Sequence, residues 1–247
     1  MIQFKNIAKS FGAKVVLHDV SFDVQKGEVF FIIGASGVGK SVLIKHLVGL
    51  LSPDGGEIWL DGEEISKFDE RRMGTVRKKC AMVFQHSTLF DSMTCRENVA
   101  LPLRKHKGLS QKDALDEARR RLEVVHMHEF CDRYPSALGD GMRKRVAIAR
   151  ALTLDPEYVL FDEPTTSLDP VSARRVDKLI RELSDKLGVT SIVVSHDLAS
   201  IFSIADRIVM LYQGRVKMLG TPGEFQASTD GVVQQFINGH ATGPMEA

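Results

Sequence analysis

The sequence predicts an α/β fold in which helices cover a mixed, mainly parallel sheet. Short runs of consecutive apolar residues at Val29–Ile33 and 158–161 are typical of strands buried on both faces. A helical pattern over residues 171–187 precedes another such run at 191–194, and this strand–helix–strand order favours parallel pairing. An alternating strand near the N-terminus and a long helical stretch in the middle add an antiparallel β-subdomain and an inserted α-helical subdomain.

The bulk composition supports an ordinary globular protein. The chain has 247 residues, of which 43% are hydrophobic and 26% charged, so wholesale disorder is not expected. The formal net charge of +1 argues against an extended nucleic-acid surface and against attachment to anionic lipid by charge alone. The cysteines at positions 80, 95 and 131 show no metal-ligand spacing, and we expect them to be reduced.

The N-terminal part of the chain predicts an antiparallel strand followed by a buried one. Val20, Phe22 and Val24 alternate with polar residues, which indicates a strand with one buried face. Gly27 turns the chain into the buried strand Val29–Ile33. An apolar helix is then predicted over residues 42–51, and another strand over 57–60.

The middle of the chain differs in pattern from both ends. After a buried strand at 80–84, residues from about 87 to 151 are mostly helical and rich in charge, whereas strands return at 158–161, 191–194 and 207–211. We therefore expect one domain over residues 1–238 with a helical subdomain inserted at about 87–151. The small, polar tail at 239–247 is expected to be loosely ordered.

The sequence contains no candidate membrane span. No apolar run approaches the roughly 20 residues needed to cross a bilayer. The N-terminus carries no apolar block typical of a signal peptide. We expect a cytoplasmic protein whose membrane function, if any, depends on another subunit.

A phosphate-binding loop follows the first buried strand. The pattern GxxxxGK[ST] is matched, and glycine permits backbone N–H groups to close around phosphates at the start of a helix. Lys40 supplies a positive charge to the terminal phosphates, and the Ser41 hydroxyl is placed to ligate Mg²⁺. A chance glycine-rich turn is the alternative, but the flanking strand and helix disfavour it. The loop consists of Gly34, Ala35, Ser36, Gly37, Val38, Gly39, Lys40 and Ser41.

Two carboxylates end the buried strand at 158–161. Asp162 and Glu163 would be costly side by side unless a cation offsets their charge, which a metal–nucleotide site provides. We expect Asp162 to hold the Mg²⁺ shell and Glu163 to orient and polarise the attacking water. The alternative is a pair that caps the following helix, and the phosphate loop upstream favours the catalytic interpretation.

Two further polar residues follow buried strands in the same way. His196 comes after the strand at 191–194, where parallel sheets bind ligands, and is predicted to contact the γ-phosphate and the water. Gln85 ends the strand at 80–84 and is predicted to contact Mg²⁺ or water. A structural histidine and a surface glutamine are the alternatives for these two residues.

In this order, the motifs resemble those of the ATP-binding subunits of ABC transporters over residues 1 to about 228. The resemblance implies that Phe11 stacks on adenine, that Gln85 forms the Q-loop, and that His196 is the switch histidine. It also implies a D-loop at 167–169 that contains Asp169. It implies a paired mechanism, in which residues of one copy complete the nucleotide site of a second copy. These residues are Gly139, Asp140, Gly141 and Met142 of the signature segment (residues 138–142), together with Asp169.

The signature segment departs from the LSGGQ or LSGGM pattern of the family. Gly139 replaces the serine and Asp140 replaces the first motif glycine, whereas Gly141 is kept. A carboxylate a few ångströms from a triphosphate is unfavourable by on the order of 1–4 kcal/mol. We therefore expect weaker ATP-driven closure, unless Asp140 caps its helix and points aside.

Segments around the insert are most similar to the ATPases of Mla/MCE-type lipid transporters, MlaF-like proteins. They lie at 76–79, 84–94, 97–104, 141–145 and 235–239. The resemblance implies ATP and Mg²⁺ as cofactors and phospholipid transport between the inner membrane and the outer envelope. Its implied partners are a second copy, an integral membrane permease (MlaE-like), an MCE-domain lipid-binding subunit and a small STAS-domain protein (MlaB-like). It places the chain peripherally on the cytoplasmic face of the inner membrane, with a tail that is either flexible or in contact with the second copy.

Apolar residues of the insert fit a groove for a helix of the permease, or simply the core of the insert itself. They are Leu89, Phe90, Met93, Val99 and Leu101.

Other function classes remain open at this stage. A non-lipid ABC importer is the nearest alternative. A non-transport ABC ATPase acting on DNA or ribosomes is disfavoured by the single phosphate loop, the absence of sustained heptads and the near-zero charge. A phosphoryl-transferring kinase is disfavoured by Glu163 beside Asp162. No nucleic-acid partner is expected.

Overall fold

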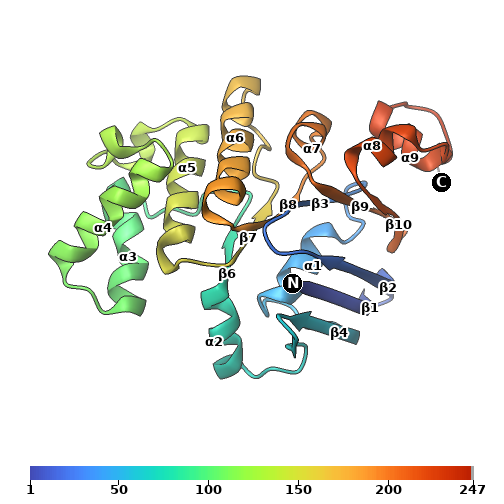
Figure 1. The fold of residues 1–247 in the computed structure, drawn as a ribbon, viewed down its shortest axis with the longest axis horizontal. Coiled ribbons are helices and arrows are strands. Elements are labelled where there is room, and N and C mark those ends of the chain that lie inside the picture. The colour runs from blue at the N-terminus through green and yellow to red at the C-terminus, as the bar shows by residue number, and fades with distance from the viewer. Residues whose placement is uncertain (246–247) are drawn as a thin grey trace.

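The central element of the structure is a mixed β-sheet with helices on both faces. The structure is a computed structural model and describes residues 1–245. Within these residues, a six-stranded sheet has the order β10-β9-β3-β8-β7-β6, in which neighbours are parallel except for the β9–β10 hairpin (Figure 1). The strands are β3 (Val29–Ile33), β6 (Cys80–Val83), β7 (Tyr158–Asp162), β8 (Thr190–Val194), β9 (Arg207–Tyr212) and β10 (Arg215–Gly220). This confirms the predicted α/β fold class.

The second sheet is antiparallel and packs across one face of the first. Its order within the described residues is β2-β1-β4-β5. Alternate residues of β3 separate two hydrophobic cores: Phe30 and Ile32 face the antiparallel sheet, whereas Phe31 and Ile33 face the other helical layer. The predicted alternation of Val20, Phe22 and Val24 is confirmed, since all three are buried. The strands are β1 (Ile2–Phe11), β2 (Lys14–Val24), β4 (Gly55–Leu60) and β5 (Glu63–Glu64).

The helices around the central sheet begin and end at recognisable signals. α6 begins after Asp169, whose carboxylate accepts hydrogen bonds from the N–H groups of Val171 and Ser172, and ends before Gly188. The apolar helix expected at 42–51 is instead α1 over Lys40–Leu47, because Gly49 takes a left-handed φ of 67° that ends the helical path. The bounds are α1 (Lys40–Leu47), α2 (Glu70–Lys79), α6 (Pro170–Leu187), α7 (Leu198–Ile204), α8 (Pro222–Ala227) and α9 (Gly231–Asn238).

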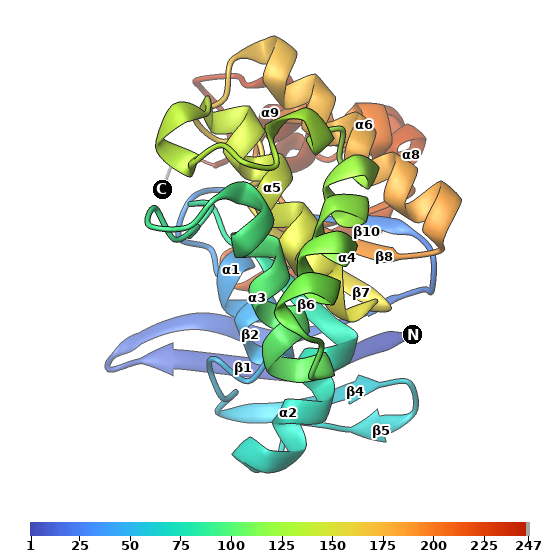
Figure 2. The ribbon, with the colours of Figure 1, turned by 90° about the vertical axis from the view of Figure 1, so that its left-hand side faces the viewer.

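The helical insert lies at one end of the molecule, beyond β6 (Figures 1 and 2). Its first helix begins with a capping box between Thr94 and Glu97. The wholly buried Asn98 holds the preceding turn by donating to the carbonyl oxygens of Phe90, Met93 and Thr94. The elements are α3 (Cys95–Lys107), α4 (Gln111–Val124), η1 (His128–Phe130), η2 (Pro135–Ala137), α5 (Asp140–Ala151) and η3 (Leu152–Leu154).

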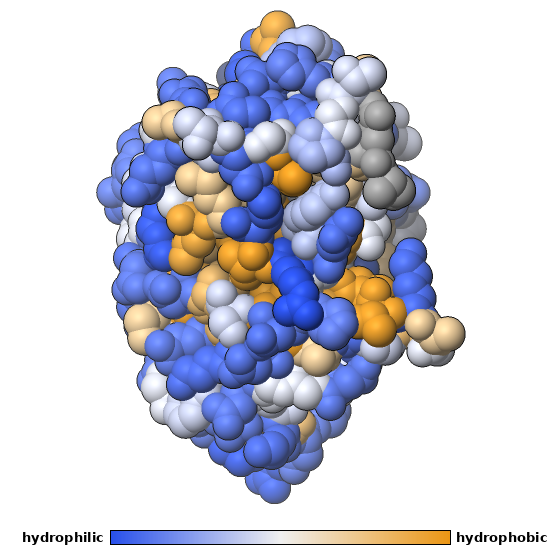
Figure 3. All heavy atoms as spheres, turned by 90° about the vertical axis from the view of Figure 1, so that its right-hand side faces the viewer, coloured by the Kyte–Doolittle hydropathy of each residue, from blue (hydrophilic) through white to orange (hydrophobic). Residues whose placement is uncertain are grey.

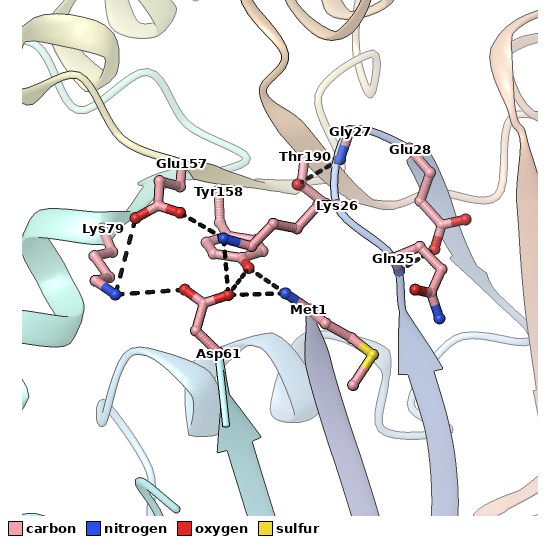
Figure 4. Close-up of polar contacts among 10 residues, drawn as sticks. All are labelled: Met1, Gln25, Lys26, Gly27, Glu28, Asp61, Lys79, Glu157, Tyr158 and Thr190. Carbon is pink, nitrogen blue, oxygen red and sulfur yellow. Dashed lines mark hydrogen bonds and ion pairs between the residues drawn. The ribbon is translucent and has the colours of Figure 1, made fainter. Parts of the chain in front are cut away.

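A charged cluster joins the antiparallel sheet to the amino end of β7 (Figure 4). Asp61 accepts from the Met1 amine at 2.9 Å and from the Tyr158 hydroxyl at 2.7 Å, and pairs with Lys26 at 3.1 Å. Burial by itself would raise the pKa of Asp61, but these hydrogen bonds hold it well below its usual range. Lys26 also reaches Glu157 at 2.9 Å. The cluster fixes the two sheets together at the end of β7 that lies away from Asp162.

The C-terminal segment folds back over the last strands as far as the structure describes it. The Tyr212 hydroxyl donates to the Pro244 carbonyl at 3.1 Å, and the N–H of Met245 donates to Gln235 Oε1 at 2.7 Å. The remainder of the tail predicted at 239–247, residues 246–247, lies outside the described residues. This side of the molecule shows hydrophobic residues set among hydrophilic ones (Figure 3). None of the helices in residues 1–245 combines the length and the apolarity that crossing a membrane requires.

Candidate functional site

The phosphate loop connects β3 to α1 in a conformation that its glycines permit. Gly34 has a φ of 139°, and a Cβ there would lie 2.3 Å from the Leu211 carbonyl oxygen. Gly39 has a φ of 107°, and a Cβ would meet the Leu17 side chain at 2.5 Å. Both positions therefore exclude any side chain. The loop is fixed against β9 and β2 by contacts that only glycine allows.

The polar side chains of the phosphate loop are held by partners within the chain. Lys40 Nζ donates to the carbonyl oxygens of Gly34 at 2.8 Å and Ala35 at 3.1 Å. Burial lowers the pKa of Lys40, and the nearby charges of Glu163 and Asp162 oppose that shift. Ser41 Oγ donates to Asp162 Oδ1 at 2.5 Å, so the hydroxyl and the carboxylate converge on one point.

Glu163 takes a backbone conformation that turns its carboxylate toward this loop. Its φ is 51°, a left-handed value that is unusual for a non-glycine residue, and its N–H donates to the Val194 carbonyl at 2.9 Å. The carboxylate oxygen Oε2 lies 2.9 Å from His196 Nδ1 and accepts from Thr166 Oγ1 at 3.1 Å. Glu163 and His196, the predicted catalytic residues that follow β7 and β8, are thus in direct contact.

One cavity of about 400 Å³ gathers most of the predicted site. It contains the predicted adenine contact Phe11, whose side chain is 47% exposed at the end of β1. Asp162 lies behind the cavity through its bond to Ser41. The lining residues are Phe11, Val16, Ser36, Gly37, Gly39, Lys40, Ser41, Val42, Gln85, Glu163, Thr166 and His196.

The residues expected to act on a second copy do not line this cavity. Asp140 lines a separate cavity of about 340 Å³ together with Gln85, Arg143 and Lys144, so Gln85 borders both. Asp169 caps α6 and does not line the cavity of the phosphate loop of its own chain. The signature segment is therefore brought near the Gln85 loop and not to the phosphate loop of the same copy.

The alternative considered for Asp140, that it caps its helix, is wrong. Gly139 occupies the N-cap of α5, and Asp140 is the first helical residue. With no side chain at position 139, the cap has no hydrogen bond from a side chain, and the Asp140 carboxylate pairs with the Arg143 guanidinium. The carboxylate does point aside, but an arginine one turn further along the helix is the reason.

Contacts within the chain explain why position 141 is a glycine. A Cβ on Gly141 would lie 2.8 Å from the Ser172 Cβ on α6. Met142, beside it, packs partly buried against the main core. These contacts seat the first turn of α5 on α6.

The structure adds residues that the sequence reasoning missed. Thr166 bonds to Glu163 and follows it by three positions, which is a local signal. Val16 and Val42 line the cavity as ordinary apolar residues and give no sequence signal. Arg143 could have been found from its i,i+3 spacing to Asp140. Lys144 reaches the Gln85 carbonyl from 59 positions away, so only the fold brings the two together.

The sequence pattern of the family described as ABC transporter matches residues 17–166. The chain belongs to the ABC transporter family of ATP-binding proteins. This confirms the resemblance drawn from the motifs. As an ABC ATPase, the chain binds and hydrolyses ATP.

Several transport ATP-binding proteins are similar to this chain over nearly its whole length. The intermembrane phospholipid transport ATP-binding protein MlaF of Escherichia coli K12 is 37% identical over 245 residues, which is 99% of this chain and 91% of MlaF. MlaF of Haemophilus influenzae is 38% identical, with 99% and 93% covered. A probable ribonucleotide transport ATP-binding protein, mkl of Mycobacterium leprae, is 35% identical, with 99% and 70% covered.

Solved ABC structures share the fold. The dimeric post-hydrolysis state of the ATP-binding cassette MJ0796 with ADP and phosphate has a TM-score of 0.81 and 31% identity, and the match covers 90% of this chain and 99% of that one. The structure of cbiO1 from Clostridium perfringens, part of the ABC transporter complex cbiONQ, has a TM-score of 0.85 and 27% identity, with 97% and 95% covered.

Proposed function

We propose that this ABC ATPase works as a pair of copies and drives phospholipid transport between the inner membrane and the outer envelope. One observation carries the ATPase part: the cavity that joins Phe11, the phosphate loop, Gln85, Glu163 and His196. The similarity to MlaF over nearly the full length of both chains supports the phospholipid part. Residues 1–238 would form the ATPase domain, and residues 87–151 its inserted subdomain.

ATP binding follows from the residues around the cavity. The phosphates fit against the N–H groups of the phosphate loop and the start of α1, where the helix dipole favours negative charge. Lys40 would exchange the carbonyls of Gly34 and Ala35 for phosphate oxygens. The exposed ring of Phe11 is free to stack on the base.

The donor set beside the phosphates suits Mg²⁺. Ser41 Oγ and Asp162 Oδ1 are oxygen donors already 2.5 Å apart, and Gln85 borders the same cavity with an amide oxygen. These three residues would hold the ion, which supplies charge neutralisation to the phosphates when bound. The hydroxyl that now bonds to Asp162 would turn toward the ion.

Hydrolysis needs a water in line with the γ-phosphate and an acceptor for its proton. We assign the acceptor to Glu163, whose carboxylate is fixed by Thr166 and His196. The water oxygen forms a bond to the γ-phosphorus, the bond from that phosphorus to the bridging oxygen breaks and leaves its electron pair on ADP, and the water proton moves to Glu163. His196, beside Glu163, would contact the γ-phosphate and the water.

A second copy would complete each site. The start of α5, with Gly139, Asp140, Gly141 and Met142, and Asp169 at the start of α6 would face the partner's nucleotide. The dimeric state of the similar cassette MJ0796 supports this pairing. The Asp140–Arg143 pair leaves the approaching helix end close to neutral, which reduces the repulsion expected from Asp140 alone.

The membrane partner would dock between β6 and the helical insert. A cavity of about 200 Å³ there is lined by Phe84, Pro102, His106 and Arg150, among others. Of the apolar residues considered for docking, Val99 is wholly buried and belongs to the core of the insert, whereas Phe90 is 50% exposed. An MlaE-like permease, with an MCE-domain subunit and an MlaB-like STAS-domain protein, fits the similarity to MlaF. The chain would then lie peripherally on the cytoplasmic face of the inner membrane.

The ATP-driven pairing is tested with Glu163→Gln, which removes the proton acceptor but keeps the shape of the side chain. In Mg-ATP, this variant is expected to form a stable dimer, measured by size exclusion with light scattering, whereas it stays monomeric in ADP. The matched control Glu163→Gln with Lys40→Met should stay monomeric in both. A persistent monomer that transfers phosphate to a small molecule would instead favour the interpretation of this chain as a kinase.

The transported molecule is tested on the native complex. Purification through this chain should bring along an integral membrane protein that has no phosphate loop, together with bound phospholipid identified by mass spectrometry. Phospholipid vesicles should stimulate the ATPase of this complex. A complex that holds no lipid and responds to a soluble solute would support the non-lipid importer.

A further inference from the structure

Helices α6 and α7 pack side by side and share a cluster of charged side chains (Figure 1). Asp177 on α6 is 2% exposed, and its Oδ2 accepts from the Ser200 hydroxyl at 3.0 Å. The same hydroxyl lies 2.9 Å from Oδ2 of Asp197, the residue just before α7. Because a hydroxyl has one proton to donate, Ser200 by itself can satisfy only one of these two carboxylates at a time.

Arg174 supplies the positive charge that this cluster needs. It lies on α6, one turn before Asp177, and its Nη1 is 2.9 Å from Asp177 Oδ2. Its Nη2 donates to Asp197 Oδ2 at 2.5 Å and to Ser200 Oγ at 3.1 Å. Burial raises the pKa of Asp177 to about 6, although the Ser200 hydroxyl and the Arg174 charge both oppose the shift. Without the guanidinium, two carboxylates would share one hydroxyl and repel each other.

Asp197 fixes the chain on the far side of His196. Its Oδ1 accepts from the first two free N–H groups of α7 at 3.0 and 3.3 Å, which makes it the N-cap of that helix. Its own N–H donates at 3.0 Å to the hydroxyl of Ser195, which is wholly buried at the end of β8. His196 therefore lies between two fixed residues, of which Ser195 is held by the sheet and Asp197 by Arg174.

The ring of His196 has little else to hold it in place. Its side chain is 61% exposed, and its one polar contact among the residues that the structure describes is Glu163, with 2.9 Å between Nδ1 and Oε2. The directions open to a side chain depend on the backbone that carries it. A shift of the backbone at Asp197 would therefore turn the ring away from Glu163.

We propose that Arg174 is a positioning residue for ATP hydrolysis, which fixes Asp197 and thereby keeps His196 directed at Glu163. Arg174 does not line the nucleotide cavity, so it acts through the backbone at His196 and not on the nucleotide. The inference rests on the role in hydrolysis that is proposed above for His196.

The expected effect falls on the chemical step. Without the guanidinium, the Asp197 carboxylate is free to move away from Asp177, and the first turn of α7 moves with it. A displacement of about 1 Å at a catalytic group can lower a rate by up to about 100-fold. The phosphate loop and Phe11 belong to other elements, so we expect ATP binding to change little.

The test measures steady-state ATP hydrolysis by the full chain in its native complex. Arg174→Met removes the donors but keeps much of the length of the side chain. It should lower kcat about tenfold, with KM for ATP within about twofold of wild type. Arg174→Lys keeps a cation with three donors and should restore at least part of kcat. Lys178→Met is the matched control, because Lys178 is a cation of the same helix that is 79% exposed and pairs only with Glu182, at 3.8 Å.

A second variant separates position from stability. Arg174→Met leaves the buried Asp177 carboxylate without its cation, which destabilises the fold. Adding Asp177→Asn removes that charge and should recover the melting temperature, but it leaves Asp197 without Arg174. The double variant should therefore keep the low kcat. Asp177→Asn by itself retains the bond between Arg174 and Asp197 and should hydrolyse ATP at close to the wild-type rate.

A double-mutant cycle shows whether Arg174 acts through His196. His196→Ala should lower kcat more than Arg174→Met does, and the combined variant should be no slower than His196→Ala. If Arg174→Met does not fold, its double variant with Asp177→Asn takes its place in the cycle.

The outcomes distinguish this inference from the proposed function. Additive losses in the cycle, an unchanged kcat in Arg174→Met, or full kcat in the double variant with Asp177→Asn would each overturn the positioning role alone. If His196→Ala hydrolyses ATP at the wild-type rate, the role proposed for His196 fails first, and the role of Arg174 fails with it.

Discussion

The phosphate loop of one copy and the N-terminus of α5 of the other copy are both helix starts that we assign to one nucleotide. The two regions are built differently. At the phosphate loop, the backbone is fixed by glycines that no side chain can replace, and Lys40 and Ser41 already have partners within 3.1 Å. At α5, the N-cap is a glycine with open space around it, and the first helical residue is an acid. The phosphate loop tolerates few substitutions, whereas the N-terminus of α5 departs from the family pattern at Gly139 and Asp140.

The difference shows how much each region depends on its surroundings. The phosphate loop lies between β2, β3 and β9, so a wrong residue collides with the core of its own chain. The α5 terminus meets its ligand only in the pair, and the charge of Asp140 can be balanced locally by Arg143. A missing serine and an added carboxylate are therefore compatible with a stable subunit, and their effects should appear only on closure.

The largest effect is expected at the phosphate loop. Lys40→Met removes a buried cation that is held in place to meet the phosphates, and should weaken ATP binding by on the order of 100-fold, as the loss of about 3 kcal/mol implies. Titration with a fluorescent ATP analogue measures it. Lys45→Met on the same helix is the control and should bind normally. Unchanged ATP affinity in Lys40→Met would contradict the claim that the phosphate loop tolerates less change than the N-terminus of α5.

An intermediate effect is expected at the α5 terminus, where Arg143 balances Asp140. Arg143→Ala leaves the carboxylate unpaired near the partner's γ-phosphate, and should raise the ATP concentration needed for dimerisation about tenfold in the Glu163→Gln background. The measurement is dimer formation against ATP concentration. Asp140→Gly should lower the concentration needed and raise the ATPase rate of the otherwise unchanged chain.

The double variant sharpens this prediction. Asp140→Gly with Arg143→Ala removes both charges, and the gain from Asp140→Gly should be larger in the Arg143→Ala background than in the otherwise unchanged chain, because an unpaired carboxylate repels the phosphate more than a paired one. This non-additive result is expected only if the two side chains act as a pair facing an anion. Purely additive effects, or no gain in Asp140→Gly, would show that the altered signature segment does not meet the nucleotide.

The smallest effect is expected for Phe11, at the rim of the cavity. Phe11→Ala removes an exposed stacking surface and should weaken ATP binding by about fivefold, near the lower end for base stacking. Phe11→Trp should bind at least as well as wild type. The measurement is again titration with the fluorescent analogue, and equal affinity for all three proteins would place the base elsewhere.

The parts of this protein that depend on local chemistry could be predicted from its amino-acid sequence. The buried strands β3, β7 and β8, the alternating face of β2, and the phosphate loop were all predicted, because apolar runs, alternation and glycine spacing each have few structural solutions. The convergence of Gln85, Glu163 and His196 also followed, since the carboxyl ends of parallel strands meet at one edge of a sheet.

Features that depend on contacts between distant segments became visible only in the folded structure. It ended α1 at Leu47, made Gly139 and not Asp140 the N-cap of α5, and paired Asp140 with Arg143. It also placed the Lys144 and Arg150 cations against backbone carbonyls within residues 84–88, about 60 residues away in the chain. These hydrogen bonds depend on where the carbonyl oxygens lie in space, and the oxygens come within reach of the cations only when β6 and α5 pack together.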